Sequence, residues 1–190
     1  MSNEIPLTNI DFNKHLNFSQ LKAAVQSGNA SFVAFYLAQP DCPLSDVLED
    51  IGYPDADGYN PTVVHSLLYE AVPHPAVLKL LLKDGRFNPN ANNKDAFYRC
   101  LLSGSIEGIK LFYEDKRFSF PEDALVKAAE LGGKEVIEFL LELDESEDHN
   151  LFLPETKDDA LDIALDKNDN EISEIIMKYL DNSPRSALSP

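Results

Sequence analysis

The side chains that could do chemistry are scattered along this sequence and form no recognisable catalytic or metal-binding pattern. The histidines lack the spacing of zinc ligands, and two cysteines alone cannot complete a zinc site: His15, His65, His74, His149, Cys42 and Cys100. The stretch from Gly104 to Gly108 has no serine at its centre, so it is not a nucleophile elbow. No phosphate-binding loop or dinucleotide fingerprint occurs.

The one segment with a calcium-loop character is DKNDNE, which begins at Asp166. It carries Glu171 where a glycine must turn the chain and Met177 where a bidentate glutamate is required. Adjacent carboxylates such as Asp158 and Asp159 are expected by chance in so acidic a chain. We therefore predict a protein that is not an enzyme and that holds no cofactor or metal.

The net charge of the chain limits the classes of partner that it is expected to bind. The 190 residues include 16 basic and 33 acidic side chains, a formal net charge of −17. Between Glu142 and Asp181 there are 14 acidic residues and three lysines. Nucleic acids and anionic membranes attract basic surfaces, so we expect neither as a partner, whereas a basic protein would be attracted.

The elements that position these residues are helices in antiparallel pairs. From Asp123 to Leu143 the sequence reads DALVKAAELGGKEVIEFLLEL, in which apolar residues recur at helical spacing on both sides of Gly132-Gly133. A glycine after a helix accepts the left-handed backbone that ends it. The short link makes the two predicted helices antiparallel neighbours.

The same pattern recurs along the chain, with a small residue at one buried position (Ala24, Cys100, Ala128, Ala164) and a turn residue four positions later (Gly28, Gly104, Gly132, Asn168). Each first helix is predicted to begin at a capping side chain: Ser19, Asn60, Asp95, Asp123 and Asp159. Their spacing of about 35 residues is typical of helical-hairpin repeats. An all-α fold with five helix pairs follows.

The phrase DGYNPTVVH, from Asp57 to His65, is similar to the turn-and-helix phrase of the ankyrin repeat, and GGKEVIEFLL resembles the ankyrin second helix. The chain therefore resembles a divergent ankyrin repeat protein. The resemblance implies an ankyrin-like helical-hairpin repeat solenoid of about five degenerate repeats, with another helical-hairpin solenoid as the alternative. We expect an N-terminal lead-in over residues 1–17, the repeat domain over 18–181 and a disordered tail over 182–190.

A second repeated phrase marks the ends of the second helices: LLLKDGRF at Leu80 to Phe87 and LFYEDKRF at Leu111 to Phe118. We expect Phe87 and Phe118 to fold back over the helix ends. Arg86 and Arg117 are expected to lie where helix carbonyls lack partners.

The ankyrin resemblance also implies where binding would occur, on the concave face formed by first helices and β-turn fingers. Carried over by position, the first-helix candidates are Lys22, Gln26, Tyr98, Arg99, Ser103, Lys127 and Glu130, and the finger candidates are Tyr59, Asn92, Asn93 and Lys94. Tyr98 and Arg99 are the preferred anchors because tyrosine and arginine dominate interface energetics. The alternative for Tyr98 is packing between neighbouring first helices.

The predicted function is a protein–protein interaction module, an adaptor or inhibitor, that binds a protein partner as a monomer. A basic protein is one candidate for that partner. The alternatives are a microbial effector delivered into a host cell and a chaperone-like escort that binds a basic protein through the acidic C-terminal end. No signal peptide or membrane span is recognisable, so a cytoplasmic location is expected, with the nucleus or a host cell as alternatives.

Overall fold

The computed structural model describes residues 16–40, 42, 44, 66–131, 133–147 and 151–182, and every regular element in these ranges is an α-helix. The all-α prediction is confirmed for this part of the chain. None of the described helices is long and apolar enough to span a membrane. The chain divides into two compact units, Met1–Phe87 and Asn88–Pro190, which are described separately.

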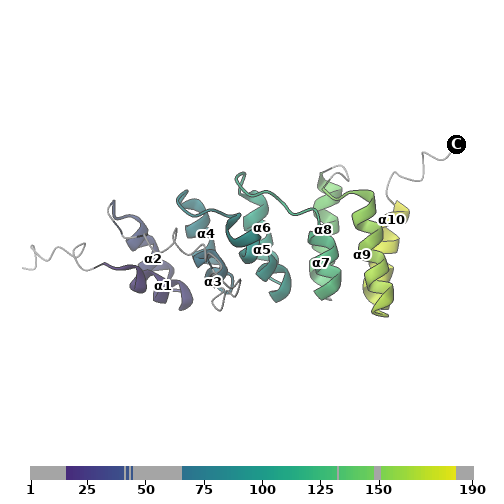
Figure 1. Cartoon of the computed structure of the whole chain (residues 1–190), viewed down its shortest axis with the longest axis horizontal. Helices are drawn as coiled ribbons and strands as arrows, with labels where there is room; N and C mark the ends of the chain where they lie inside the picture. Colours follow the sequence, from purple (N-terminus) through teal and green to yellow (C-terminus); the bar gives the residue numbers. More distant parts are fainter. Residues whose placement is uncertain are drawn as a thin grey trace, which may run out of the picture. The chain divides into compact units, whose positions relative to one another are not determined.

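In the first unit the described residues form two helix pairs, labelled α1 to α4 in Figure 1. Its helices are α1 (Phe18–Gln26), α2 (Ala30–Leu37), α3 (Leu67–Ala71) and α4 (Pro75–Lys83). Within each pair the helices pack on one another, and the pairs also contact, α1 against α3 and α2 against α4. As predicted, the second helix of the second pair begins at Pro75, where a missing N–H costs nothing.

In the second unit the described residues form three helix pairs. Its helices are α5 (Ala91–Ser103), α6 (Ile106–Glu114), α7 (Ala124–Leu131), α8 (Lys134–Ser146), α9 (Pro154–Asp166) and α10 (Asn170–Asn182). The first helices lie side by side, α7 between α5 and α9, and α8 similarly contacts α6 and α10 (Figure 1). Cys100, Ala128 and Ala164 are buried, so small side chains occur where the first helices approach.

In three of the helix pairs the turn contains a residue with a left-handed backbone. Gly28, Gly104 and Asn168 have φ of 72°, 68° and 55°, as the sequence predicts. At Gly28 the available space matters too, because a Cβ there would lie 2.6 Å from His74 Nδ1. A hydrogen bond holds His74 against this turn: its Nε2 lies 3.0 Å from the carbonyl oxygen of Gln26 at the end of α1.

Two of the five predicted helix starts, Ser19 and Asp159, are wrong. Ser19 lies inside α1, whose cap is Asn17 in a reciprocal capping box with Gln20. Asp159 lies inside α9, which begins five residues earlier at Pro154. Asp123 does immediately precede α7, and its carbonyl accepts the Lys127 N–H at 2.9 Å. Asn60 lies outside the described residues.

The finger predicted at Asn92, Asn93 and Lys94 is a left-handed helical turn rather than part of a β-hairpin. These residues have φ of 47°, 53° and 64° at the beginning of α5. Asparagine tolerates this region better than other residues with a side chain. Right-handed helical geometry follows the turn from Asp95, which was the predicted start of this helix.

An aromatic cluster fills part of the second unit. The Phe97 ring centroid lies 5.0 Å from that of Phe118, 5.1 Å from that of Phe120 and 6.0 Å from that of Phe112. Phe118 therefore packs on the end of α6, as predicted. Phe87 of the first unit is also buried, with 2% of its surface exposed.

Candidate functional site

The predicted binding positions on the first helices lie at or near the surface, in two different units. Lys22 and Gln26 are exposed on α1 of the first unit. In the second unit Tyr98 and Arg99 are half-buried on α5 and Ser103 is exposed. Lys127 and Glu130 lie on α7, and Tyr59 lies outside the described residues. The structure therefore brings together five of these candidates, on the neighbouring helices α5 and α7.

Tyr98 is held by the neighbouring helix pair. Its hydroxyl donates a hydrogen bond of 2.7 Å to Oδ1 of Asp123, the residue that precedes α7. Burial and this bond raise the pKa of the Tyr98 hydroxyl. The hydroxyl of Tyr98 therefore contacts the next first helix, as the alternative prediction for this residue has it. Its ring is half-buried and still contributes to the surface.

The charged candidates on α7 are bound to each other. Lys127 Nζ lies 2.7 Å from Glu130 Oε2, one helical turn along. The Ser103 hydroxyl, 3.4 Å from the Cys100 carbonyl oxygen, bonds within its own helix. The α5–α7 surface thus combines an aromatic ring, a guanidinium, a hydroxyl and an internally paired charge. Tyrosine and arginine are among the side chains enriched at protein–protein interfaces.

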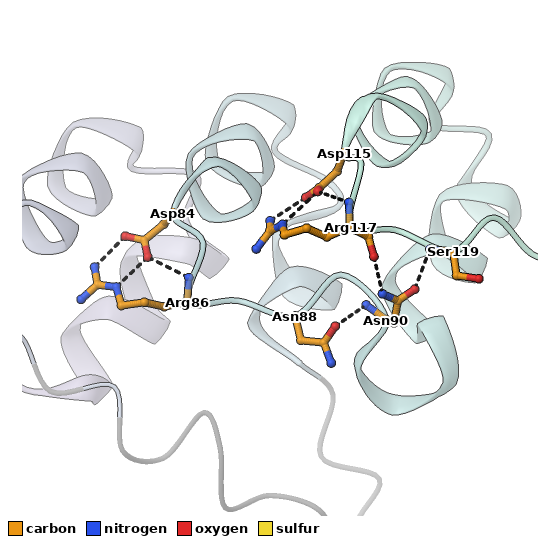
Figure 2. Close-up of polar contacts among 7 residues, drawn as sticks. All are labelled: Asp84, Arg86, Asn88, Asn90, Asp115, Arg117 and Ser119. Carbon is orange, nitrogen blue, oxygen red and sulfur yellow. Dashed lines mark hydrogen bonds and ion pairs between the residues drawn. The ribbon is translucent and has the colours of Figure 1, made fainter.

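A second feature was missed in the sequence, a carboxylate clasp at the end of two successive second helices (Figure 2). We use the term carboxylate clasp for an aspartate whose carboxylate binds the guanidinium of the arginine two residues later in the chain. Arg86 donates to both carboxylate oxygens of Asp84 at 2.6 Å, and Arg117 donates to those of Asp115 at 2.9 and 2.6 Å. The Asp115 carboxylate also accepts the Arg117 backbone N–H at 3.0 Å.

The clasps are charge-neutral and geometrically specific, as bidentate pairs are. The hydrogen bond from Arg117 holds the pKa of the Asp115 carboxyl below its usual value. In the first unit the clasped Arg86 also donates to the Leu37 carbonyl oxygen, at the end of α2, at 3.0 Å. The prediction that Arg86 lies near bare helix carbonyls is confirmed.

The segment that follows the Asp115–Arg117 clasp is held by one side-chain amide. In the second unit Asn90 donates to the Arg117 carbonyl oxygen at 2.8 Å and accepts the Ser119 N–H at 2.9 Å (Figure 2). Both bonds flank Phe118, so Asn90 fixes the segment that carries this ring. The loop edge is therefore built from self-satisfied polar groups, which indicates a structural role.

A third aspartate occupies the same position at the end of α8 and is fully buried. Asp144 follows Leu141 by three residues, as Asp84 follows Leu81 and Asp115 follows Phe112. Its carboxylate binds Lys157 Nζ at 2.6 Å and the Phe152 N–H at 2.9 Å, and it accepts a bond from the Tyr179 hydroxyl. Asp144 has no exposed surface and Lys157 only 3%.

Opposing effects set the pKa of the buried Asp144 carboxyl. Burial alone would raise the pKa of Asp144, but the bonds from Lys157 and Tyr179 outweigh it and the pKa lies below its usual value. Burial and the bond to Asp144 raise the pKa of Tyr179. The spacing of 31 and 29 residues between the three aspartates was the signal that could have revealed this group in the sequence.

Other constellations in the described residues offer little chemistry. No three His, Cys, Asp or Glu side chains in this part of the chain are placed to hold a metal ion. A shallow hollow of about 390 Å³ is lined by Tyr113, Glu114, Lys116, Glu147 and Leu151, and its Tyr113 hydroxyl donates to Glu147. The bond to the Glu147 carboxylate raises the pKa of the Tyr113 hydroxyl.

No family model, no curated protein and no solved structure matches this chain.

Proposed function

We propose that this chain is a non-enzymatic, ankyrin-like repeat module that binds a protein partner on the face formed by its first helices. The observation that supports this most is the side-by-side packing of α5, α7 and α9, each followed by a short turn and a second helix. Stacked hairpins of this kind present side chains from successive repeats along one continuous surface.

The α5–α7 surface is the part of that face best suited to hold a partner. Arg99 lies beside Tyr98 on α5, and Lys127 and Glu130 follow on α7. Because Asp123 fixes the Tyr98 hydroxyl, the ring loses little further freedom on binding. A preorganised tyrosine next to an arginine is the kind of anchor that dominates protein interfaces.

The proposed module acts as a monomer in the cytoplasm. Both cysteines, Cys42 and Cys100, are free thiols, which supports a reducing compartment. Free thiols at buried or half-buried positions would otherwise be candidates for oxidation.

The test is capture of partners by the immobilised chain, followed by charge reversal on the proposed face. Arg99→Glu should weaken binding of a captured protein at least about tenfold, equivalent to about 1.4 kcal/mol. Lys79→Glu is the matched control, because Lys79 is exposed on the second helix α4. Equal losses in the two variants, both with wild-type circular dichroism, would contradict the assignment of the face.

A further inference from the structure

The outer side of the α9–α10 pair carries apolar side chains at two positions that the α7–α8 pair buries. A shift of 36 residues superimposes the α7–α8 pair on the α9–α10 pair in sequence, as the turn positions Gly132 and Asn168 show. Under this shift Ala129 corresponds to Leu165, and Leu141 corresponds to Met177. Ala129 and Leu141 are 1% and 3% exposed, whereas Leu165 and Met177 are 49% and 40% exposed.

The difference arises from what packs on each pair. Helix α9 packs against α7, and α10 packs against α8, so the α7–α8 pair is covered by its successor (Figure 1). Among the described helices, no further pair follows α10. A helix pair that no neighbouring pair covers ordinarily has a polar outer side. Leucine and methionine at these positions keep the apolar character of a face that another helix covers.

Carboxylates surround these two apolar side chains. On α10, Glu174 and Asp181 lie three residues before and four residues after Met177, on the same side of the helix. On α9, Asp162 lies three residues before Leu165 and Asp166 directly follows it. All four carboxylates are exposed. The only basic residue of α10 is Lys178.

We propose that this face, defined by Leu165 and Met177 with Asp162, Asp166, Glu174 and Asp181 around them, binds an amphipathic helix of a partner protein whose apolar stripe is flanked by lysine or arginine. A helix fits because helices α9 and α10 themselves occupy the equivalent place on the preceding pair. Charge complementarity selects a basic flank. A second copy of the chain would bring the same carboxylates against each other, which is repulsive.

This end face is a different surface from the first-helix face and does not depend on it. A chain could bind one partner through α5 and α7 and a basic helix through the outer side of α9 and α10. The experiment therefore uses a probe that addresses the end face alone.

The probe is a fluorescein-labelled helical peptide of about 20 residues with leucines at i, i+4, i+7 and i+11 and lysines on both flanks. Its binding to the full chain is measured by fluorescence anisotropy at low and physiological salt. A peptide with glutamates in place of the lysines tests the charge requirement. Circular dichroism and thermal unfolding confirm that each protein variant is folded.

We expect Leu165→Asn with Met177→Gln to weaken binding of the lysine peptide at least about tenfold. Asp162→Asn with Glu174→Gln and Asp181→Asn should weaken it by a similar factor at low salt and by much less at high salt, because salt screens exposed charges. Leu131→Asn is the matched control, since Leu131 is 44% exposed at the end of α7 and belongs to neither α9 nor α10. It should leave the affinity unchanged.

Three results would overturn the proposal. The first is equal binding of the lysine and glutamate peptides, or no binding of either. The second is loss of affinity in Leu131→Asn as large as in the end-face variant. The third is a concentration-dependent dimer in analytical ultracentrifugation that the end-face variant abolishes, which would place a second copy of the chain on this face.

Discussion

Gly108 illustrates how a single residue without a side chain fixes a helix pair. It lies in the first turn of α6, where its N–H donates to the Ser105 hydroxyl at 3.2 Å. A Cβ at this position would lie 2.6 Å from Cys100 Sγ and 2.9 Å from Ser105 Oγ. The Cys100 thiol belongs to the buried side of α5, and burial raises its pKa to about 12.

Gly108→Ala should therefore destabilise the protein by about 1–3 kcal/mol, the usual range for overpacking a close contact. Urea unfolding followed by circular dichroism measures the change. Gly85→Ala is the control, because an added Cβ there would meet no atom within 4 Å beyond the adjoining residues of the chain. Cys100→Ala should recover part of the loss in the Gly108→Ala background. Equal stability of the two glycine variants would contradict the packing argument.

For single residues, the sequence predicted the positions of positive φ better than it predicted the residues that cap the helices. Gly28, Gly104 and Asn168 were identified because few residue types tolerate a positive φ. The cap of α1 was misplaced at Ser19, although Asn17 and Gln20 have the spacing of a capping box. Serine and aspartate are common in this chain, so a capping residue type alone does not locate a helix start.

Tyr98 and Asp123 connect two elements, the middle of α5 and the beginning of α7. The bond between them is half-buried, so replacing the tyrosine hydroxyl removes a bond while the ring stays in place. Tyr98→Phe and Asp123→Asn should each cost about 0.5–1.5 kcal/mol of stability. A double-mutant cycle should give a coupling energy of about 1 kcal/mol. Additive effects would show that the two side chains act independently.

Two equivalent positions on second helices should respond differently to truncation. Leu141 on α8 is 3% exposed and Met177 on α10 is 40% exposed. Leu141→Ala should cost about 2–5 kcal/mol because it leaves a cavity between packed helices. Met177→Ala should cost less than about 1 kcal/mol, as expected for a partly exposed side chain. Chemical denaturation measures both, and a larger loss at Met177 would mean that something covers it.

At the scale of elements, the existence and order of the helix pairs were predictable, while the contacts that join them were not. Apolar periodicity identifies a helix, and glycine or asparagine marks its end. The clasp of Asp84 with Arg86 lies inside the repeated phrase LLLKDGRF. The sequence predicted a position for the arginine and the phenylalanine of this phrase, but no role for its aspartate. The partner of Asp144 could not be read from local spacing, because Lys157 comes 13 residues later on a different helix.

The chain has a formal net charge of −17, and one of its carboxylates, that of Asp144, is buried. As the pH falls, protonation of the exposed carboxylates and protonation of Asp144 should change the stability of the folded chain in opposite directions. As the pH falls from about 7 towards 5, the first protons that exposed carboxylates bind reduce their mutual repulsion, which should slightly stabilise the folded chain. Asp144 has a folded pKa below its usual value. Its contribution is therefore fully present above the unfolded pKa of about 3.9 and is lost as pH falls through the folded pKa.

The free energy of unfolding should consequently stay level or rise from pH 7 to pH 5 and fall steeply below about pH 4. Asp144→Asn should cost about 3–5 kcal/mol at pH 7, because it leaves Lys157 buried without its charged partner. The same variant should lose less additional stability below pH 4, since it has no carboxyl to protonate. Urea unfolding at a series of pH values measures these changes.

Salt and a matched variant separate the two effects. High salt screens the repulsion between exposed carboxylates, so it should remove the gain between pH 7 and pH 5, whereas the buried pair is screened much less and the loss below pH 4 should remain. Glu142→Gln removes an exposed carboxylate two residues before Asp144 and should keep the wild-type acid response. If Asp144→Asn keeps the wild-type slope below pH 4, then acid unfolding is governed by the summed surface charge, and the buried pair contributes only to packing.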